Sequence, residues 1–144
     1  MKYQQYIQNY ELLLDGGKWP NFHDAEILSL NFCTHVYESD GKGHLTLSVG
    51  PSLVVTLELV ALENPYVVTL KFNDCSEIMV QGLSHQCFIN DLLFDIEERG
   101  FFRGGEPLPP YVIVNFETLG CFSLAFKCFS VEVLSRINES LLDE

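Results

Sequence analysis

Residues Leu53–Phe72 read LVVTLELVALENPYVVTLKF, and the spacing of their apolar side chains decides the fold class. In both halves of the stretch, polar residues such as Thr56 and Lys71 separate apolar residues at every second position. A period of two is typical of antiparallel strands that bury one face and leave the other in water. Glu63–Pro65 lies between the halves and predicts a turn. The apolar positions are Leu53, Val55, Leu57, Leu59, Tyr66, Val68, Leu70 and Phe72.

The same alternation continues on both sides of this stretch. Cys87–Glu98 is ambiguous, because an alternating strand and a helical stripe both fit its apolar residues, and a strand is preferred. Arg99–Pro110 is rich in glycine and proline and predicts a loop. Ser135–Glu144 predicts a frayed polar tail. The other predicted strands are Leu28–Phe32, Leu45–Val49, Ile78–Gln81, Val112–Glu117, Phe122–Cys128 and Ser130–Leu134.

The N-terminal segment has a different period. Tyr3, Tyr6, Ile7, Tyr10 and Leu14 fall at three- and four-residue spacings, which predicts one face of a helix that ends at Asp15–Gly17. About eight strands then follow, with no strand-helix-strand alternation, which excludes a doubly wound α/β fold. We expect one domain over residues 1–144. Its predicted class is α+β, with the N-terminal helix packed on a curved, mostly antiparallel sheet.

Charge limits the classes of partner. The 144 residues include 8 Lys and Arg against 20 Asp and Glu, a net charge of −12. Such a surface repels nucleic acid and anionic membranes and attracts a basic protein, although acidity can also serve solubility alone. No apolar run approaches the ~20 residues that span a bilayer, and Met1–Tyr10 lacks the apolar region of a signal peptide. We expect a cytoplasmic protein.

Few residues suggest chemistry. His23-Asp24 is the most suggestive pair, because imidazole and carboxylate together can hold a divalent cation. His35, His44 and His85 do not supply further ligands at a suitable spacing, so a structural role in the turn is preferred. Cys87 with His85 would lack an orienting acid. The segment Asp95–Glu98 is better read as a solvated face than as an acidic metal cluster.

No nucleotide-binding glycine loop, nucleophile elbow or CxxC pair occurs. The five cysteines are scattered and lie mostly in apolar surroundings, which favours buried structural thiols. They are Cys33, Cys75, Cys87, Cys121 and Cys128. We therefore expect no catalytic residues, no metal and no cofactor.

The residues WPNFHDAEI at Trp19–Ile27 resemble the opening motif of a bacterial immunity-protein family, number 50 of the polymorphic toxin systems. Glu77–Asp91 and Gly120–Val133 are similar to later segments of that family, in the same order. Leu83-Ser84 and Cys87 depart from its pattern, where Phe-Asn and Asn are expected. The resemblance implies a fold-supporting role for the first motif, at the corner before the first strand. Its members here are Trp19, Pro20, Phe22, His23 and Asp24.

The resemblance also implies a small non-catalytic antidote that binds a cognate toxin domain. A basic toxin such as a nuclease would suit the net charge. The tentative contact residues combine carboxylates with the aromatic pair of the Arg99–Pro110 loop. For the two rings themselves, the preferred interpretation is that they fold back onto the core. They are Asp91, Asp95, Glu97, Glu98, Phe101, Phe102 and Glu106. The alternatives are a small metal-dependent enzyme that uses His23-Asp24 and an oligomeric scaffold or regulatory module.

Overall fold

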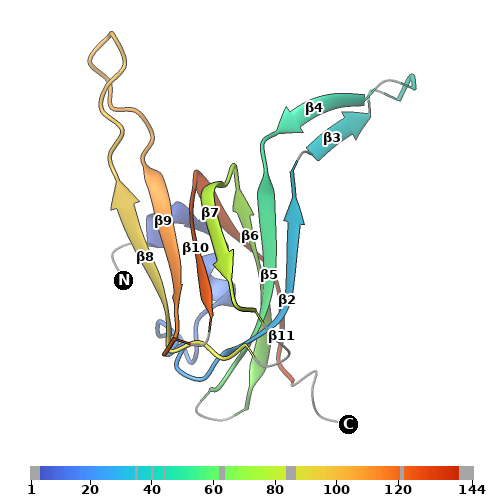
Figure 1. Cartoon of the computed structure of the whole chain (residues 1–144), viewed down its shortest axis with the longest axis vertical. Coiled ribbons are helices and arrows are strands. Elements are labelled where there is room, and N and C mark those ends of the chain that lie inside the picture. Colours follow the sequence, from blue (N-terminus) through green and yellow to red (C-terminus); the bar gives the residue numbers. More distant parts are fainter. Residues whose placement is uncertain are drawn as a thin grey trace.

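Two β-sheets packed face to face make up the body of the protein (Figure 1). The structure is a computed structural model that describes residues 4–34, 36–39, 41–43, 45–61, 64–83, 87–120 and 122–139. The first sheet consists, in spatial order, of β1 (Ile7–Gln8), β11 (Ser130–Ile137), β6 (Tyr66–Asn73), β5 (Ser52–Leu59) and β2 (Glu26–Cys33). The second consists of β7 (Ser76–Gln81), β10 (Ser123–Cys128), β9 (Tyr111–Glu117) and β8 (Asp91–Glu97).

The sheets are almost entirely antiparallel, as predicted; the exception is the parallel pair β1–β11. A separate ribbon of β3 (Val36–Ser39) and β4 (Leu45–Val49) projects from one end of the body. The strand preferred for Cys87–Glu98 is confirmed over Asp91–Glu97, which is β8. The prediction of one curved sheet is wrong, because the chain bends sharply between two sheets.

That bend occurs where β6 passes into β7 and β10 passes into β11. The backbone N–H of Phe129 donates to the carbonyl of Asn73 at 2.9 Å, so the two crossing segments stay paired through the corner. Asp74 adopts a positive φ of 55° and its carboxylate accepts the N–H of Gly50 at 2.9 Å. Each of these two segments therefore supplies one strand to the first sheet and one to the second. The alternation of apolar residues along the sequence does not reveal this change of sheet.

The core lies between the sheets and uses the predicted alternating positions. The apolar residues of β5 and β6 from Leu53 to Phe72 named above are all at most 1% exposed. Phe72 of the first sheet makes edge contacts with the rings of Phe116 and Phe126 in the second, at centroid distances of 6.2 and 4.8 Å. Aromatic contacts of this kind add to the stability that burial alone contributes.

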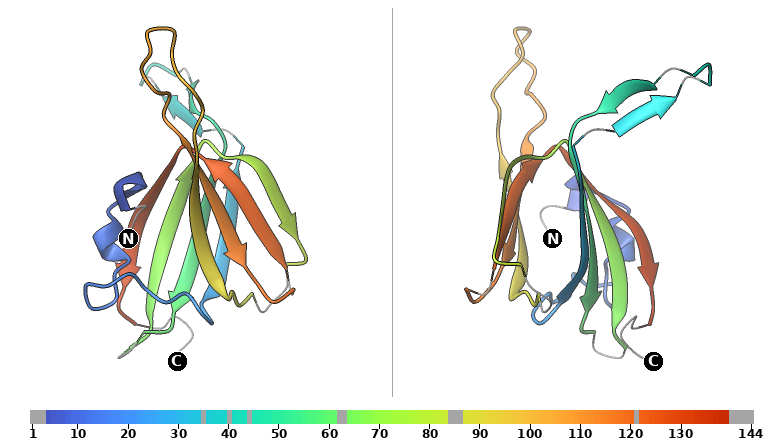
Figure 2. Two further views of the ribbon diagram at one scale, coloured as in Figure 1. Left: turned by 90° about the vertical axis from the view of Figure 1, so that its left-hand side faces the viewer. Right: turned by 45° about the vertical axis from the view of Figure 1, so that its right-hand side comes forward.

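The predicted N-terminal helix is absent from the described residues. Two short 3₁₀ turns, η1 (Gln4–Tyr6) and η2 (Tyr10–Leu12), flank β1 instead, and Asn9 breaks the helical path with a φ of 60°. The edge of β11 offers backbone partners to β1, and a short segment of Tyr, Ile and Asn has little helical stability of its own. The class α+β therefore gives way to a mostly β fold. Figure 2 shows this segment, in blue, beside β11.

Two further expectations fail for local reasons. β11 continues to Ile137, so the tail does not fray from Ser135; Arg136 holds this part of the strand against the N-terminal segment. In β2 the pairing with β5 shifts between Ile27 and Ser29, and Phe32, expected on the apolar face, is 47% exposed. Phe32 still pairs with the buried Leu53 and so keeps the predicted face; what the bulge changes is that Ile27, rather than Leu28, lies on the buried side of β2.

Candidate functional site

The His23-Asp24 motif lies where the two sheets meet at one end of the body. Short backbone ladders join it to the segment before β8: Ile27 N–H donates to Cys87 O and Ile89 N–H to Ala25 O, each at 2.8 Å. The N–H of Asp24 also donates to Ile89 O at 3.0 Å. The chain before β2 therefore closes the sandwich, and the tertiary fold places the Trp19–Ile27 and Glu77–Asp91 motifs side by side.

Aromatic packing fixes this corner. Phe22 is 1% exposed, and the ring of Trp19 makes edge contacts with Phe22 and with Phe94 of β8 at centroid distances of 5.9 and 6.2 Å. Pro20 is also buried. These three motif residues contribute apolar surface to the junction between a loop and the second sheet, which is a stabilising role.

His23 and Asp24 face solvent rather than a closed site. Asn90 donates from its amide nitrogen to Glu117 Oε1 at 2.9 Å, so its oxygen is free to accept the Nδ1–H of His23 at 3.0 Å. His23 Nε2 lies 3.6 Å from Asp24 Oδ2, and the two side chains are 57% and 70% exposed. The imidazole thus connects the corner to β9 through Asn90.

The described residues contain no group of three or more His, Cys, Asp and Glu side chains placed to hold a metal ion. His35, His44, His85 and Cys121 lie outside the described residues. Within the described part, the surroundings of His23 supply hydrogen-bonding partners rather than a ligand set.

The cysteines that the structure describes form no disulfide bonds. Cys75, Cys87 and Cys128 are buried, whereas Cys33 is exposed. Burial raises the pKa of Cys75 to about 12, and burial also raises the pKa of Cys128 well above its usual range. Both of these thiols therefore stay protonated at neutral pH and are poor nucleophiles.

The carboxylates predicted to contact a partner divide into two groups. Asp91, Asp95 and Glu97 belong to β8, and Glu97 forms an ion pair with Lys127 at 2.6 Å. Lys127 also contacts Glu77 at 3.2 Å, and its hydrogen bonds to Glu97 and Glu77 raise the lysine pKa. Asp91 and Asp95 accept hydrogen bonds from the backbone N–H of the residue that follows each one. This group is partly engaged within the protein.

The second group lies beyond the end of the sheet, on a projecting segment, residues 98–110, that we call the arm (Figure 1). Phe101 and Phe102 are 72% and 53% exposed, so the prediction that they fold onto the core is wrong. Glu98 and Glu106 are exposed on the same segment. Ten residues of extended chain span about 33 Å, so Asp91 and the arm tip do not form one compact patch.

The arm is anchored at its root. Arg99 Nη1 donates to the carbonyl of Pro109 at 3.2 Å, and its guanidinium carbon lies 4.9 Å from the ring centre of Tyr111 and 4.8 Å from that of Phe129. Backbone bonds continue outward, including Phe102 N–H to Glu106 O at 2.7 Å. These contacts hold the two aromatic side chains away from the body.

A groove of about 440 Å³ lies between the arm and the N-terminal segment. Its walls are mostly apolar, and Glu98 is the charged residue among them. The lining residues are Tyr6, Ile96, Glu98, Gly100, Phe101, Pro107, Leu108, Pro109 and Pro110. Sequence reasoning missed this groove, because Tyr6 comes from a segment distant in sequence and was expected in a helix. The sequence feature that could have pointed to the groove is the proline-rich stretch Pro107–Pro110, because proline restricts the backbone and so forms a rigid wall.

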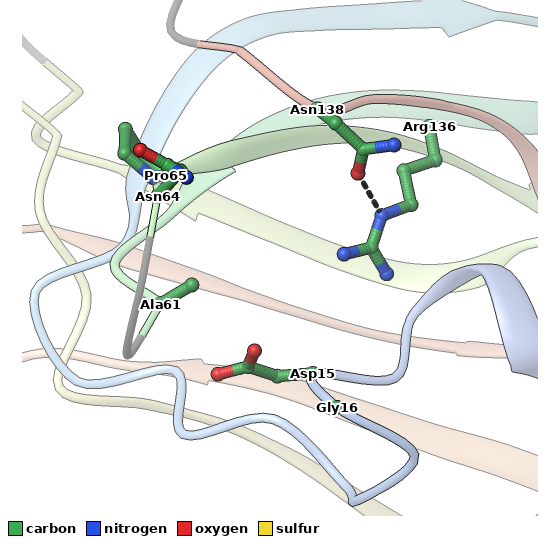
Figure 3. Close-up of a pocket in the computed structure, with 7 residues that line it drawn as sticks. All are labelled: Asp15, Gly16, Ala61, Asn64, Pro65, Arg136 and Asn138. Carbon is green, nitrogen blue, oxygen red and sulfur yellow. Dashed lines mark hydrogen bonds between the residues drawn. The ribbon is translucent and has the colours of Figure 1, made fainter.

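A second cavity of about 330 Å³ is lined by both polar and apolar residues (Figure 3). Arg136 lines it, but its side chain donates to the carbonyls of Leu12 and Leu14 and to Asn138. Its guanidinium also lies 3.9 Å from the ring centre of Tyr66. These contacts tie the N-terminal segment to β11, so we assign this arginine a structural role.

No protein-family model, no curated protein and no solved structure matches the chain. Among the described residues, no helix is long and apolar enough to cross a membrane. Function is therefore inferred from the surfaces described above.

Proposed function

We propose that this protein is a non-catalytic immunity protein that binds and neutralises a cognate bacterial toxin domain in the cytoplasm. The observation that carries the proposal is the arm, which presents Phe101 and Phe102 to solvent on a chain of net charge −12. Aromatic side chains held away from the core add little to the stability of the fold. Stability therefore does not account for two phenylalanines on this segment. They are, however, common anchors of protein interfaces.

The arm tip can contribute an appreciable part of the binding energy of a complex. A Phe side chain buries about 150–250 Å² when fully covered, so the exposed fractions leave roughly 200–250 Å² of mostly apolar surface. Burying that area is worth roughly 5 kcal/mol, and only the part that exceeds the cost of association appears as affinity. Two anchors of this size suit a small interface centred on the arm.

Net charge indicates the kind of partner. An excess of 12 negative charges speeds association with a basic surface and disfavours contact with phosphate. Toxin domains that cleave nucleic acid need Lys and Arg to hold their substrate, and an acidic protein can cover those residues. The resemblance of Trp19–Ile27 to an immunity-protein motif supports the same function.

The test is co-expression with the product of the adjacent upstream gene, scoring growth and recovery of a complex. We expect rescue of growth and a complex that weakens as salt is raised. Phe101→Ser with Phe102→Ser should abolish rescue, whereas Leu119→Ser should not. Leu119 is a matched control because it is 83% exposed and lies in the β9–β10 turn, at the other end of β9 from the arm. Failure of the wild-type chain to rescue growth or form a complex would refute the proposal.

A further inference from the structure

The groove at the root of the arm has the properties of a preformed pocket for one side chain of a partner. Its volume of about 440 Å³ exceeds that of a single large apolar side chain, and Ile96, Leu108 and Phe101 supply apolar walls. Tyr6 closes it from the N-terminal segment. Grooves with mostly apolar walls and a few polar groups are typical binding sites.

Successive side chains at the root of the arm point to opposite sides, which separates the charge of Glu98 from that of Arg99. Glu98 and Gly100 line the groove, whereas Arg99 between them stacks against Tyr111 and Phe129. The carboxylate of Glu98 is exposed and has no hydrogen bond or ion pair with the residues that the structure describes. The groove therefore presents one uncompensated negative charge at an apolar surface.

The walls are also held in place before any partner binds. The N–H of Leu108 donates to Gly100 O at 2.9 Å, which joins the two sides of the arm across the groove wall. Pro107, Pro109 and Pro110 have restricted backbone angles, so little conformational entropy remains to be lost there on binding.

We propose that the groove receives a cationic segment of the toxin, which inserts one aliphatic or aromatic side chain and places a Lys or Arg on Glu98. This inference rests on the proposed function and adds the contact point and the chemistry of the segment that is bound. A second copy of the chain is disfavoured as the occupant, because it carries the same charge of −12. A basic segment complements both the apolar walls and the carboxylate.

The first test measures affinity for the toxin domain recovered by co-expression, with each variant purified as the full chain. Glu98→Lys and Leu108→Ser should each weaken binding by about tenfold or more, and Glu98→Lys should also flatten the salt dependence. Glu139→Lys makes the same charge change at an exposed position beyond the C-terminal end of β11, whose other end follows the Phe129 that contacts Arg99, and should alter affinity by less than about threefold. Unchanged melting temperatures would show that the variants fold.

The second test places a photoreactive phenylalanine analogue at position 108, or at position 119 as the control, in the co-expressed chain. We expect position 108 to crosslink to a toxin peptide that contains Lys or Arg, and position 119 not to crosslink. If the complex forms but position 108 crosslinks to a second copy or to nothing, and both groove variants bind like wild type, the groove assignment is wrong while the proposed function stands. If no complex forms, the proposed function itself fails.

Discussion

The hydroxyl of Tyr66 makes a buried contact whose removal can be predicted at two pH values. Tyr66 is 1% exposed and its hydroxyl donates to the carbonyl of Leu13 at 2.7 Å, which joins β6 to the N-terminal segment. Tyr66→Phe removes that bond and leaves a carbonyl without its partner. At pH 7 we expect the free energy of unfolding to fall by about 1–2 kcal/mol, which lowers the melting temperature by about 3–6 °C.

High pH should remove this difference. Burial raises the pKa of Tyr66 to about 12, against the opposing effect of Arg136, whereas an unfolded tyrosine ionises near 10. The contribution of the neutral phenol is complete below pH 10 and is lost as pH rises from 10 to 12, by about 1.4 kcal/mol for each pH unit. The Tyr66→Phe variant has no phenol to ionise at this position and so no such loss. Wild type and variant should therefore be nearly equal in stability at pH 11.

The assay is urea unfolding at pH 7 and at pH 11, followed by circular dichroism. Tyr111→Phe is the matched control, because the structure shows ring contacts but no hydrogen bond for the Tyr111 hydroxyl among the described residues; its stability should change by less than about 0.5 kcal/mol. A Tyr66→Phe variant as stable as wild type at pH 7, or equally destabilised at both pH values, would refute the reasoning.

Three further variants test the core, the corner and the arm. Phe72→Ala should cost about 3–5 kcal/mol in urea unfolding, because it empties the centre of the contact between the sheets. Gly50→Ala would place a methyl 2.9 Å from Asp74 Oδ1, so calorimetry should show a destabilisation of roughly 1–2 kcal/mol unless that carboxylate moves freely. Phe101→Ser with Phe102→Ser should leave the melting temperature within about 2 °C of wild type, since both rings lie outside the core.

Several parts of the fold were predictable because they depend on local alternation. β5 and β6 bury every apolar position predicted within Leu53–Phe72, and the hairpin of β9 and β10 lies where the strands Val112–Glu117 and Phe122–Cys128 are predicted. In these strands every second side chain points toward the opposing sheet. The period of two therefore remains visible in the sequence. The N-terminal segment failed, because the edge of β11 and the left-handed Asn9 outweigh a weak helical pattern.

The candidate site was predictable only in part. Sequence reasoning selected the residues of the arm, but it expected Phe101 and Phe102 in the core and joined them to Asp91 in one patch. The structure separates these groups, because an extended strand carries the chain away from the body over roughly 3.3 Å per residue. Tyr6 of the groove wall could not be predicted as a neighbour of Leu108, since no local pattern links positions so far apart.

The amino-acid sequence alone determines that antiparallel strands dominate the chain, that its surface is acidic and which faces the central strands bury, because these follow from the identity and period of neighbouring residues. Division into two sheets, the corner at Asp74, the docking of the N-terminal segment on β11 and the exposure of the arm are decided by tertiary structure. Each of these depends on hydrogen bonds or packing between segments distant in the chain, whose free energy exists only when the whole fold brings them together.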